Sequence, residues 1–271
     1  MSLRPIGVFD SGVGGLSVLN ALRAELPHER FVYFADTAHA PYGERTEAYV
    51  AERTCAVARQ LVADHDIKAL VVACNTATAA AVHLLRTDHP QLPLVGVEPA
   101  LKPAVAQSRT RHIAVLATRG TLASRKFDAL HASVAEQARF SLVPCDGLAA
   151  AIEASDAPKI MALCARYTGA AGTFGLEDSE IDTLVLGCTH YPFVADELRR
   201  HTGDAARFID TGAPVAQQTR RLLTQVAQLA ATSEGGVQLR TSGSLASLEA
   251  AAARWLAAPV RPFAPLSLAA H

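Results

Sequence analysis

The fold is decided by two stretches that align without a gap, IKALVVACNTATAAAVHLLR at residues 67–86 and IDTLVLGCTHYPFVADELRR at residues 181–200. In each stretch a run of apolar residues ends at a cysteine, and a segment with apolar residues three and four positions apart follows. Such a run is typical of a buried strand in a parallel sheet, and the following spacing is typical of a helix. The chain therefore carries two copies of a strand–turn–helix unit, with a cysteine at the same point of each.

A second pair of stretches repeats in the same way, IGVFDSGVGG at residues 6–15 and IAVLATRGTL at residues 113–122. Unrelated strand-to-helix units can look alike, but two matched pairs in the same order favour two similar α/β halves. Further apolar runs alternate with helical patterns along the chain. We expect strands at 6–9, 31–34, 69–73, 94–97, 113–116, 140–143, 184–186 and 208–209. We expect helices at 16–26, 46–64, 76–86, 125–137 and 193–201, and a last helix at about 245–256. This alternation predicts the α/β class with mostly parallel sheets.

Two turn-like segments, GVEPALKP at residues 96–103 and IDTGAP at residues 209–214, are candidate crossings between the halves. They predict two pseudo-symmetric α/β domains, the first with residues 1–97 plus 211–271 and the second with residues 98–210. Ligands bind at the carboxyl ends of the strands in open α/β sheets, where both cysteines lie. We therefore expect the active site at the interface between the two domains.

The composition argues against several classes of function. Of the 271 residues, 50% are apolar, and 25 Lys and Arg balance 26 Asp and Glu to a net charge of -1. No field of one sign would draw the chain to nucleic acid or to anionic lipid, so neither is expected as a partner. The N-terminal residues lack the pattern of a signal peptide, and no run of about 18 apolar residues occurs, so we expect a cytoplasmic protein without a membrane span.

The cysteines form no C-x-x-C pair and are odd in number, which predicts neither a disulfide framework nor a zinc site; they are Cys55, Cys74, Cys145, Cys164 and Cys188. Cys74 and Cys188 end strands and precede helices, whose unpaired N–H groups would lower the pKa of a thiol from about 8.5 toward neutrality. A single cysteine at such a place is more often a small buried apolar residue. The matched pair favours reactive thiols, and we interpret the other three as packing residues.

Paired thiols in equivalent turns are compatible with a redox pair, with a nucleophile and a spare, or with two opposed proton-transfer groups. Redox cysteines are usually close in sequence, whereas these two lie in different halves. Two facing halves would place one acid/base group on each side of a bound molecule. A carbon that loses its proton to one face and regains one from the other is inverted, and two equivalent bases are what a racemase requires.

The turn DSGVGGLS at residues 10–17 follows the first strand, and Asp36 ends the second, which partly imitates a dinucleotide fingerprint. Ser17 stands where the third glycine belongs, so a nicotinamide site remains an alternative with a partial match. A tight turn that lets Asp10 and Ser11 approach a ligand explains the glycines equally well.

Groups that suit a carboxylate ligand follow both cysteines, namely the amide of Asn75 and the hydroxyls of Thr76 and Thr189. His190 lies two residues after Cys188, where it can polarise the thiol or act as a general acid. The lysines occupy no motif for a pyridoxal phosphate Schiff base, and no His or carboxylate spacing supports a metal. We therefore expect neither a cofactor nor a metal.

Six motifs in chain order resemble the glutamate racemases of the cofactor-independent aspartate/glutamate racemase family: IGVFDSGVGGLSV, ADTAHAPYG, VVACNTATA, GVEPA, ATRGT and LVLGCTHYPF. The resemblance runs from residue 6 to about residue 212 and continues more weakly to about residue 259. It implies interconversion of L- and D-glutamate without metal or coenzyme, as a supply of D-glutamate for bacterial peptidoglycan. It also implies two α/β domains of related topology with the site between them, and a homodimer as a common assembly.

Roles for individual residues follow from the same resemblance. Cys74 would be the acid and base on one face of the substrate, assisted by Asp10, and Cys188 would serve the other face. His190 and Glu153 would assist Cys188. The residues that would hold the substrate are Asp10, Ser11, Tyr42, Gly43, Asn75, Thr76, Thr189 and His190, with Thr118 and Thr121 at the far wall.

Three other functions remain as alternatives to a glutamate racemase. A racemase of the same family that acts on aspartate or a related acid would differ in the size of the side-chain pocket. A non-catalytic binding protein for a dicarboxylate or an amino acid would have no use for paired thiols and would show no isotope exchange. A nicotinamide-dependent oxidoreductase would show an absorbance change of its cofactor on adding substrate.

Overall fold

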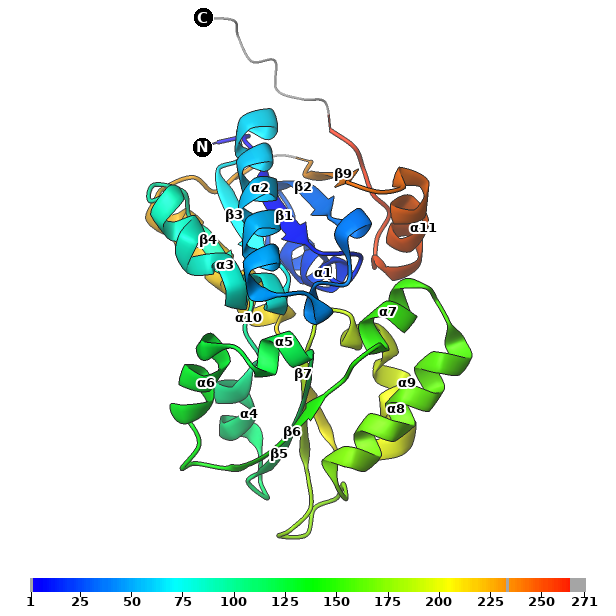
Figure 1. Ribbon diagram of the computed structural model, residues 1–271. Helices are drawn as coiled ribbons and strands as arrows, with labels where there is room; N and C mark the ends of the chain where they lie inside the picture. Colours follow the sequence, from blue (N-terminus) through cyan, green and yellow to red (C-terminus); the bar gives the residue numbers. More distant parts are fainter. Residues whose placement is uncertain (1, 233, 264–271) are drawn as a thin grey trace, which may run out of the picture.

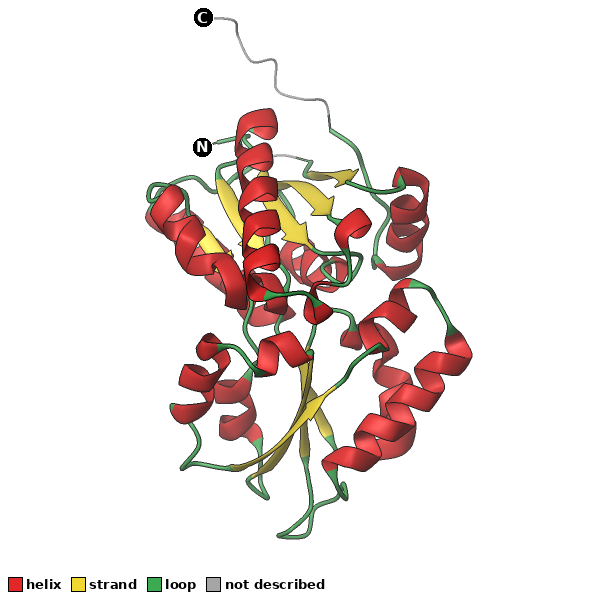
Figure 2. Ribbon diagram, in the orientation of Figure 1, coloured by secondary structure: helices red, strands yellow, loops and turns green. Residues whose placement is uncertain are grey.

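The computed structural model describes residues 2–232 and 234–263, and their strands form two sheets (Figures 1 and 2). The first sheet contains, in spatial order, β4 (Leu94–Gly96), β3 (Ala69–Val72), β1 (Ile6–Asp10), β2 (Arg30–Ala35) and β9 (Gly236–Thr241). The second contains β6 (Arg139–Pro144), β5 (His112–Ala117), β7 (Thr183–Gly187) and β8 (Arg207–Ile209). All strand pairs in these two sheets are parallel, which confirms the predicted α/β class.

The two sheets share one strand order, as the repeated stretches predict. The order β2-β1-β3-β4 in the first sheet corresponds to β6-β5-β7-β8 in the second, and β9 is added at the edge beside β2. One pair of repeats lies on β1 and β5, and the pair that carries the cysteines lies on β3 and β7. Cys74 and Cys188 therefore follow topologically equivalent central strands.

Helices cover both faces of each sheet, because successive side chains of a buried strand enter opposite cores. The first sheet carries α1 (Leu16–Glu25), α10 (Gly212–Gln225) and α11 (Leu245–Trp255) on one face and α2 (Glu47–His65) and α3 (Asn75–Asp88) on the other (Figure 1). The second carries α7 (Leu148–Glu153), α8 (Ala157–Ala171) and α9 (Ala195–Thr202) on one face and α4 (Leu101–Gln107) and α6 (Arg125–Ala132) on the other.

The chain passes from one sheet to the other at the two predicted crossings. After β4 it enters α4 and then the second sheet, and after β8 it enters α10 and returns to the first sheet. Contacts such as the hydrogen bond from Thr189 Oγ1 to Asp10 Oδ2, at 2.9 Å, join the loops at the carboxyl ends of the two sheets. The predicted position of ligand binding is therefore also the place where the two sheet units meet.

Several elements differ from the sequence-based expectations. Strand β9 and helices α8 and α10 were not expected, and α6 ends at Ala132 although the pattern predicts a helix to residue 137. After Cys188 a 3-10 turn, Tyr191–Val194, precedes α9, so the helix expected from residue 193 begins two residues later, at Ala195. Pro192 explains the delay, because it has no N–H to donate and restrains the backbone of the residue before it. No helix within 2–232 and 234–263 is both long and apolar enough to span a bilayer.

Candidate active site

Cys74 lies in the turn between β3 and α3 and caps that helix. Its sulfur accepts a hydrogen bond from the backbone N–H of Ala77 at 3.4 Å, and the residue is only 6% exposed. The hydroxyl of Ser11 lies 3.6 Å from the same sulfur. A strand that ends in a short turn before a helix thus places this thiol at the carboxyl edge of the first sheet.

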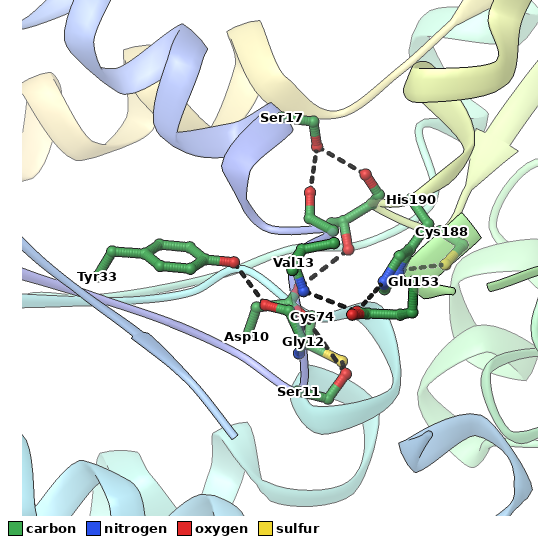
Figure 3. Close-up of polar contacts among 12 residues, drawn as sticks. Asp10, Ser11, Gly12, Val13, Ser17, Tyr33, Cys74, Glu153, Cys188 and His190 are labelled. Carbon is green, nitrogen blue, oxygen red and sulfur yellow. Dashed lines mark hydrogen bonds and ion pairs between the residues drawn. The ribbon is translucent and has the colours of Figure 1, made fainter. Parts of the chain in front are cut away.

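Asp10, at the end of the neighbouring strand β1, connects this thiol to the second sheet unit. One carboxylate oxygen accepts hydrogen bonds from the N–H of Gly12 at 2.7 Å and from the Ser11 hydroxyl at 3.3 Å. The other accepts the hydroxyl of Thr189, the residue after Cys188. A chain of polar contacts therefore runs from Cys74 through Ser11 and Asp10 to the turn of the second cysteine (Figure 3).

Cys188 follows β7 and lies beside a histidine–carboxylate pair. Its sulfur is 3.6 Å from His190 Nδ1, and His190 Nε2 is 2.6 Å from a carboxylate oxygen of Glu153 on α7. The backbone N–H of Val13 donates to that same oxygen at 2.7 Å. Figure 3 shows the His190 ring between Glu153 and Cys188, so both ring nitrogens are occupied.

The glycines of the turn at residues 10–17 have a steric reason. A Cβ atom on Gly12 would overlap the carboxylate of Glu153, and one on Gly14 would overlap the ring of His190. The backbone of this turn in the first unit therefore lies directly against the side chains beside Cys188, with no room for a Cβ atom. The glycines make room for the protein's own side chains, which removes the main support for a dinucleotide site.

Two further polar groups follow Cys74 at the start of α3. The amide of Asn75 is buried, and neither its oxygen nor its nitrogen has a hydrogen-bond partner among the described residues. The hydroxyl of Thr76 reaches across to the second unit, 3.0 Å from that of Thr118 and 3.5 Å from that of Thr121. An unpaired buried amide is costly, so the amide of Asn75 is suited to bind a polar substrate.

Comparison with known proteins identifies the family. Residues 15–219 match the family described as Asp/Glu/Hydantoin racemase. The chain belongs to this racemase family. A glutamate racemase from Ectopseudomonas mendocina (strain ymp) is 47% identical over 251 residues, which cover 92% of this chain and 93% of that protein.

Solved structures of similar proteins agree with this assignment. The structure of Escherichia coli glutamate racemase in complex with L-glutamate and the activator UDP-MurNAc-ala has a TM-score of 0.78 and 31% identity, covering 93% of this chain and 95% of that chain. The Francisella tularensis glutamate racemase in complex with D-glutamate has a TM-score of 0.81 and 25% identity, covering 99% of each chain. The protein is therefore an isomerase with the racemase fold.

On the Cys74 side of this racemase, burial dominates the electrostatics. Burial raises the pKa of the Cys74 thiol to about 12, the charge of Asp10 adds to the increase, and the contacts from Ala77 and Ser11 counteract it. The expectation that a helix start lowers the thiol pKa is therefore wrong for Cys74, because lost hydration outweighs one N–H contact. Burial also raises the pKa of Asp10, to about 6, although His190 and the Gly12 N–H oppose the shift.

On the Cys188 side, the pair of His190 and Glu153 dominates the electrostatics. Burial alone would lower the pKa of His190, but its hydrogen bonds and charge interactions with Cys188 and Glu153 raise it well above its ordinary value. Burial alone would raise the pKa of Glu153, but the hydrogen bond and charge of His190 lower it. The pairing with Glu153 therefore favours the protonated form of His190, whose Nδ1 faces the Cys188 sulfur.

The structure brings most of the predicted site residues of this racemase into one connected group: Asp10, Ser11, Cys74, Glu153, Cys188, Thr189 and His190. The side chain of Tyr42 is an exception, because its hydroxyl donates to Asp36 at 2.6 Å. Cys55, Cys145 and Cys164 pack in or against the hydrophobic cores, as we interpret them from the sequence. The chemical roles of the site residues stay predictions.

Some supporting residues had no signal in the sequence. The hydroxyl of Tyr33 donates to the carbonyl of Gly12 at 2.7 Å and so supports the turn beside Asp10. Arg53 binds Asp36 from helix α2. Within the described ranges, no group of three or more His, Cys, Asp or Glu side chains is arranged to hold a metal ion.

Proposed function

We propose that this racemase interconverts L-glutamate and D-glutamate by two-base proton transfer at the α-carbon. The observation that carries the proposal is the placement of two thiols on topologically equivalent strands of opposed sheets, in a chain 47% identical to a glutamate racemase. Similar proteins have been solved with L-glutamate and with D-glutamate. A site that serves both enantiomers fits the near symmetry of the two sheet units.

In the proposed reaction, one sulfur as thiolate removes the α-proton, and the opposite thiol returns a proton to the other face. One S–H bond forms and the other breaks, no electron is transferred to another group, and the enzyme ends each turnover with its two protonation states exchanged. The surroundings differ between the thiols. Cys74 lies near the carboxyl of Asp10, and Cys188 lies beside His190, whose raised pKa favours its protonated form.

The substrate carboxylates require donors that the site supplies. The N-terminus of α3 offers backbone N–H groups, and Asn75 offers an amide without a protein partner. The α-proton is a very weak acid, so the developing carbanion needs a closed site with fixed donors. Close contact between the units, through Asp10 with Thr189 and Val13 with Glu153, favours such a closed site.

Incubation with L-glutamate in heavy water tests the proposal. We expect the optical activity to decay toward zero, measured by circular dichroism, while deuterium enters the α-position, measured by proton NMR. Cys74→Ala and Cys188→Ala should each slow racemisation by about 10²–10⁴-fold, because each removes one proton-transfer group. Each variant should retain α-hydrogen exchange of one enantiomer only.

A matched control separates this effect from general damage. Cys55→Ala makes the same substitution on helix α2, outside the polar group of the site, and should racemise within about twofold of the unmodified enzyme. Near-normal racemisation by either Cys74→Ala or Cys188→Ala would show that the two-thiol assignment is wrong. Faster racemisation of L-aspartate than of L-glutamate would show that the substrate is wrong.

The proposal extends to the role of the product. The resemblance to the racemase family supports supply of D-glutamate for peptidoglycan by a cytoplasmic enzyme. The same resemblance supports a homodimer, which light scattering of the purified protein would test.

A further inference from the structure

A buried carboxylate next to the site is bound entirely by the protein's own side chains. Asp36 follows β2, its side chain is 0% exposed, and its backbone N–H donates to the carbonyl of Asp10 at 3.0 Å. The Arg53 guanidinium donates to both carboxylate oxygens, at 3.1 and 2.9 Å. The Tyr42 hydroxyl donates to one oxygen at 2.6 Å, and His39 Nδ1 lies 3.0 Å from the other.

This carboxylate remains an ion in spite of its burial. Burial would raise the pKa of Asp36, but the hydrogen bonds from Arg53 and Tyr42 and the charge of Arg53 lower it below its ordinary value. A bidentate guanidinium–carboxylate contact fixes the orientation of both side chains and also pairs their charges. Asp36 and Arg53 therefore form a rigid pair at one end of the loop that contains Tyr42.

The side chain of Tyr42 lies between this pair and the thiol region. The residue is 1% exposed, and its ring packs in the same hydrophobic core as Cys74 and Phe9. Because the hydroxyl donates its proton to Asp36, it cannot donate the same proton to a substrate between the thiols. Tyr42 can contribute to substrate binding only through its backbone and through the position of the residue that follows.

That following residue, Gly43, touches the second sheet unit. A Cβ atom on Gly43 would lie 2.8 Å from Cβ of Thr118, and one on Gly120 would lie 3.3 Å from the Gly43 carbonyl oxygen. Thr118 is hydrogen-bonded to Thr76, in the first turn of α3 after Cys74. The turn at residues 42–43 therefore closes one side of the site, and its position depends on how Tyr42 is held.

We propose that Asp36 and Arg53 are positioning residues, which hold Tyr42 so that the backbone of residues 42–43 faces the bound substrate against Thr118. Neither side chain touches the thiols, and both act through Tyr42. This inference rests on the proposed function, because it names how that site holds its substrate. It assigns the Tyr42 side chain to anchoring and not to direct contact with glutamate.

Two variants and one matched control test the proposal. Arg53→Lys keeps the charge but loses the bidentate contact, and Tyr42→Phe removes only the hydroxyl. Arg59→Lys makes the same substitution on the same helix at an exposed residue, whose guanidinium donates to the carbonyl of Cys55 at 3.3 Å. The readouts are KM and kcat for glutamate, and the amide hydrogen exchange of residues 37–45.

We expect KM to rise about tenfold in Arg53→Lys and about fivefold in Tyr42→Phe, with kcat within about twofold, because binding common to ground and transition state is weakened. Amide exchange of residues 37–45 should accelerate in both variants and not in Arg59→Lys. If Arg53→Lys fails to fold, the nearly isosteric Tyr42→Phe decides.

A lower kcat at unchanged KM would overturn the proposal, since it indicates loss of active protein without an effect on substrate affinity. Unchanged amide exchange of residues 37–45 in both variants would also overturn it. The exchange measurement needs no substrate. If the unmodified enzyme does not racemise glutamate, the proposed function fails, and exchange still decides whether Asp36 and Arg53 hold the loop.

Discussion

The two thiols have different neighbours, although their turns are equivalent in topology. Cys74 is buried against an acid whose pKa is raised, and Cys188 faces a histidine whose protonated form is stabilised by Glu153. A protonated His190 is a charged donor beside the Cys188 sulfur. The groups beside the Cys74 sulfur are neutral, namely the backbone N–H of Ala77 and the hydroxyl of Ser11. The surroundings of Cys74 therefore favour its protonated thiol form.

The raised pKa of Asp10 predicts an acidic limit to activity. Below about pH 6 the carboxylate of Asp10 becomes protonated and loses its negative charge. This carboxylate accepts hydrogen bonds from Gly12 and Thr189, and its charge would assist Cys74. We expect kcat/KM for glutamate to fall about tenfold per pH unit below about pH 6, measured by initial rates under circular dichroism. Asp10→Asn should be much less active, and its pH profile should lack this acidic limb, that is, the fall in kcat/KM below about pH 6. A limb that persists in Asp10→Asn would assign it to another group.

At the scale of elements, the close approach of the turn at residues 10–17 predicts a steep steric effect. Gly14→Ala would press a methyl group against the ring of His190 and against Thr189. We expect kcat/KM to fall about 10²-fold or more, because a small displacement of a proton-transfer group is costly.

A glycine with open surroundings supplies the control for this substitution. Gly169 is an exposed residue of α8, and a Cβ there would meet no atom within 4 Å. Gly169→Ala should leave kcat/KM unchanged and raise the free energy of unfolding by about 0.5–1 kcal/mol, seen as a higher Tm. Near-normal activity of Gly14→Ala would contradict the steric account.

Element boundaries show where sequence patterns succeed and fail. Strands such as β1 and β5 were predicted to within one residue at each end. A short continuous apolar run is buried on both faces only in the interior of a parallel sheet, so its ends mark the ends of the strand. Strand β9 was missed because it is an edge strand that carries Gln238 and Arg240 among its apolar residues. Its place beside β2 depends on the return of the chain through α10, which no local pattern reveals.

At the scale of the whole molecule, we propose that, among the described residues, 2–97 with 211–232 and 234–263 form one unit and 98–210 the other. The predicted extension of the first unit to residues 1 and 264–271 lies outside the described residues. The membership of the strands in the two sheets supports these boundaries. Helix α11 of the first unit contacts the segments that follow Glu153 and His190 in the chain. Trp255 stacks on Phe193, with ring centroids 4.5 Å apart, and Arg254 donates to the Ser155 hydroxyl at 2.8 Å.

This contact predicts that a residue far from the thiols affects substrate affinity. Trp255→Leu removes an aromatic pair worth about 0.5–1.5 kcal/mol, which helps to hold the two units together. We expect KM for glutamate to rise about two- to tenfold, because bound substrate must then supply more of the closing free energy. Leu245→Ala, at the exposed start of the same helix, should leave KM unchanged. An unaltered KM in Trp255→Leu would show that α11 does not contribute to closure.

The sequence by itself determined the α/β class, the two similar halves and the positions of the two cysteines at strand ends. These features follow from apolar periodicity, which is local and is repeated in two stretches of one chain. Only the tertiary structure decided which side chains meet: Glu153 with His190, Asp10 with Thr189, and Arg53 with Asp36. It also decided that Cys74 is a thiol of raised pKa, because burial depends on what the rest of the chain packs around a residue.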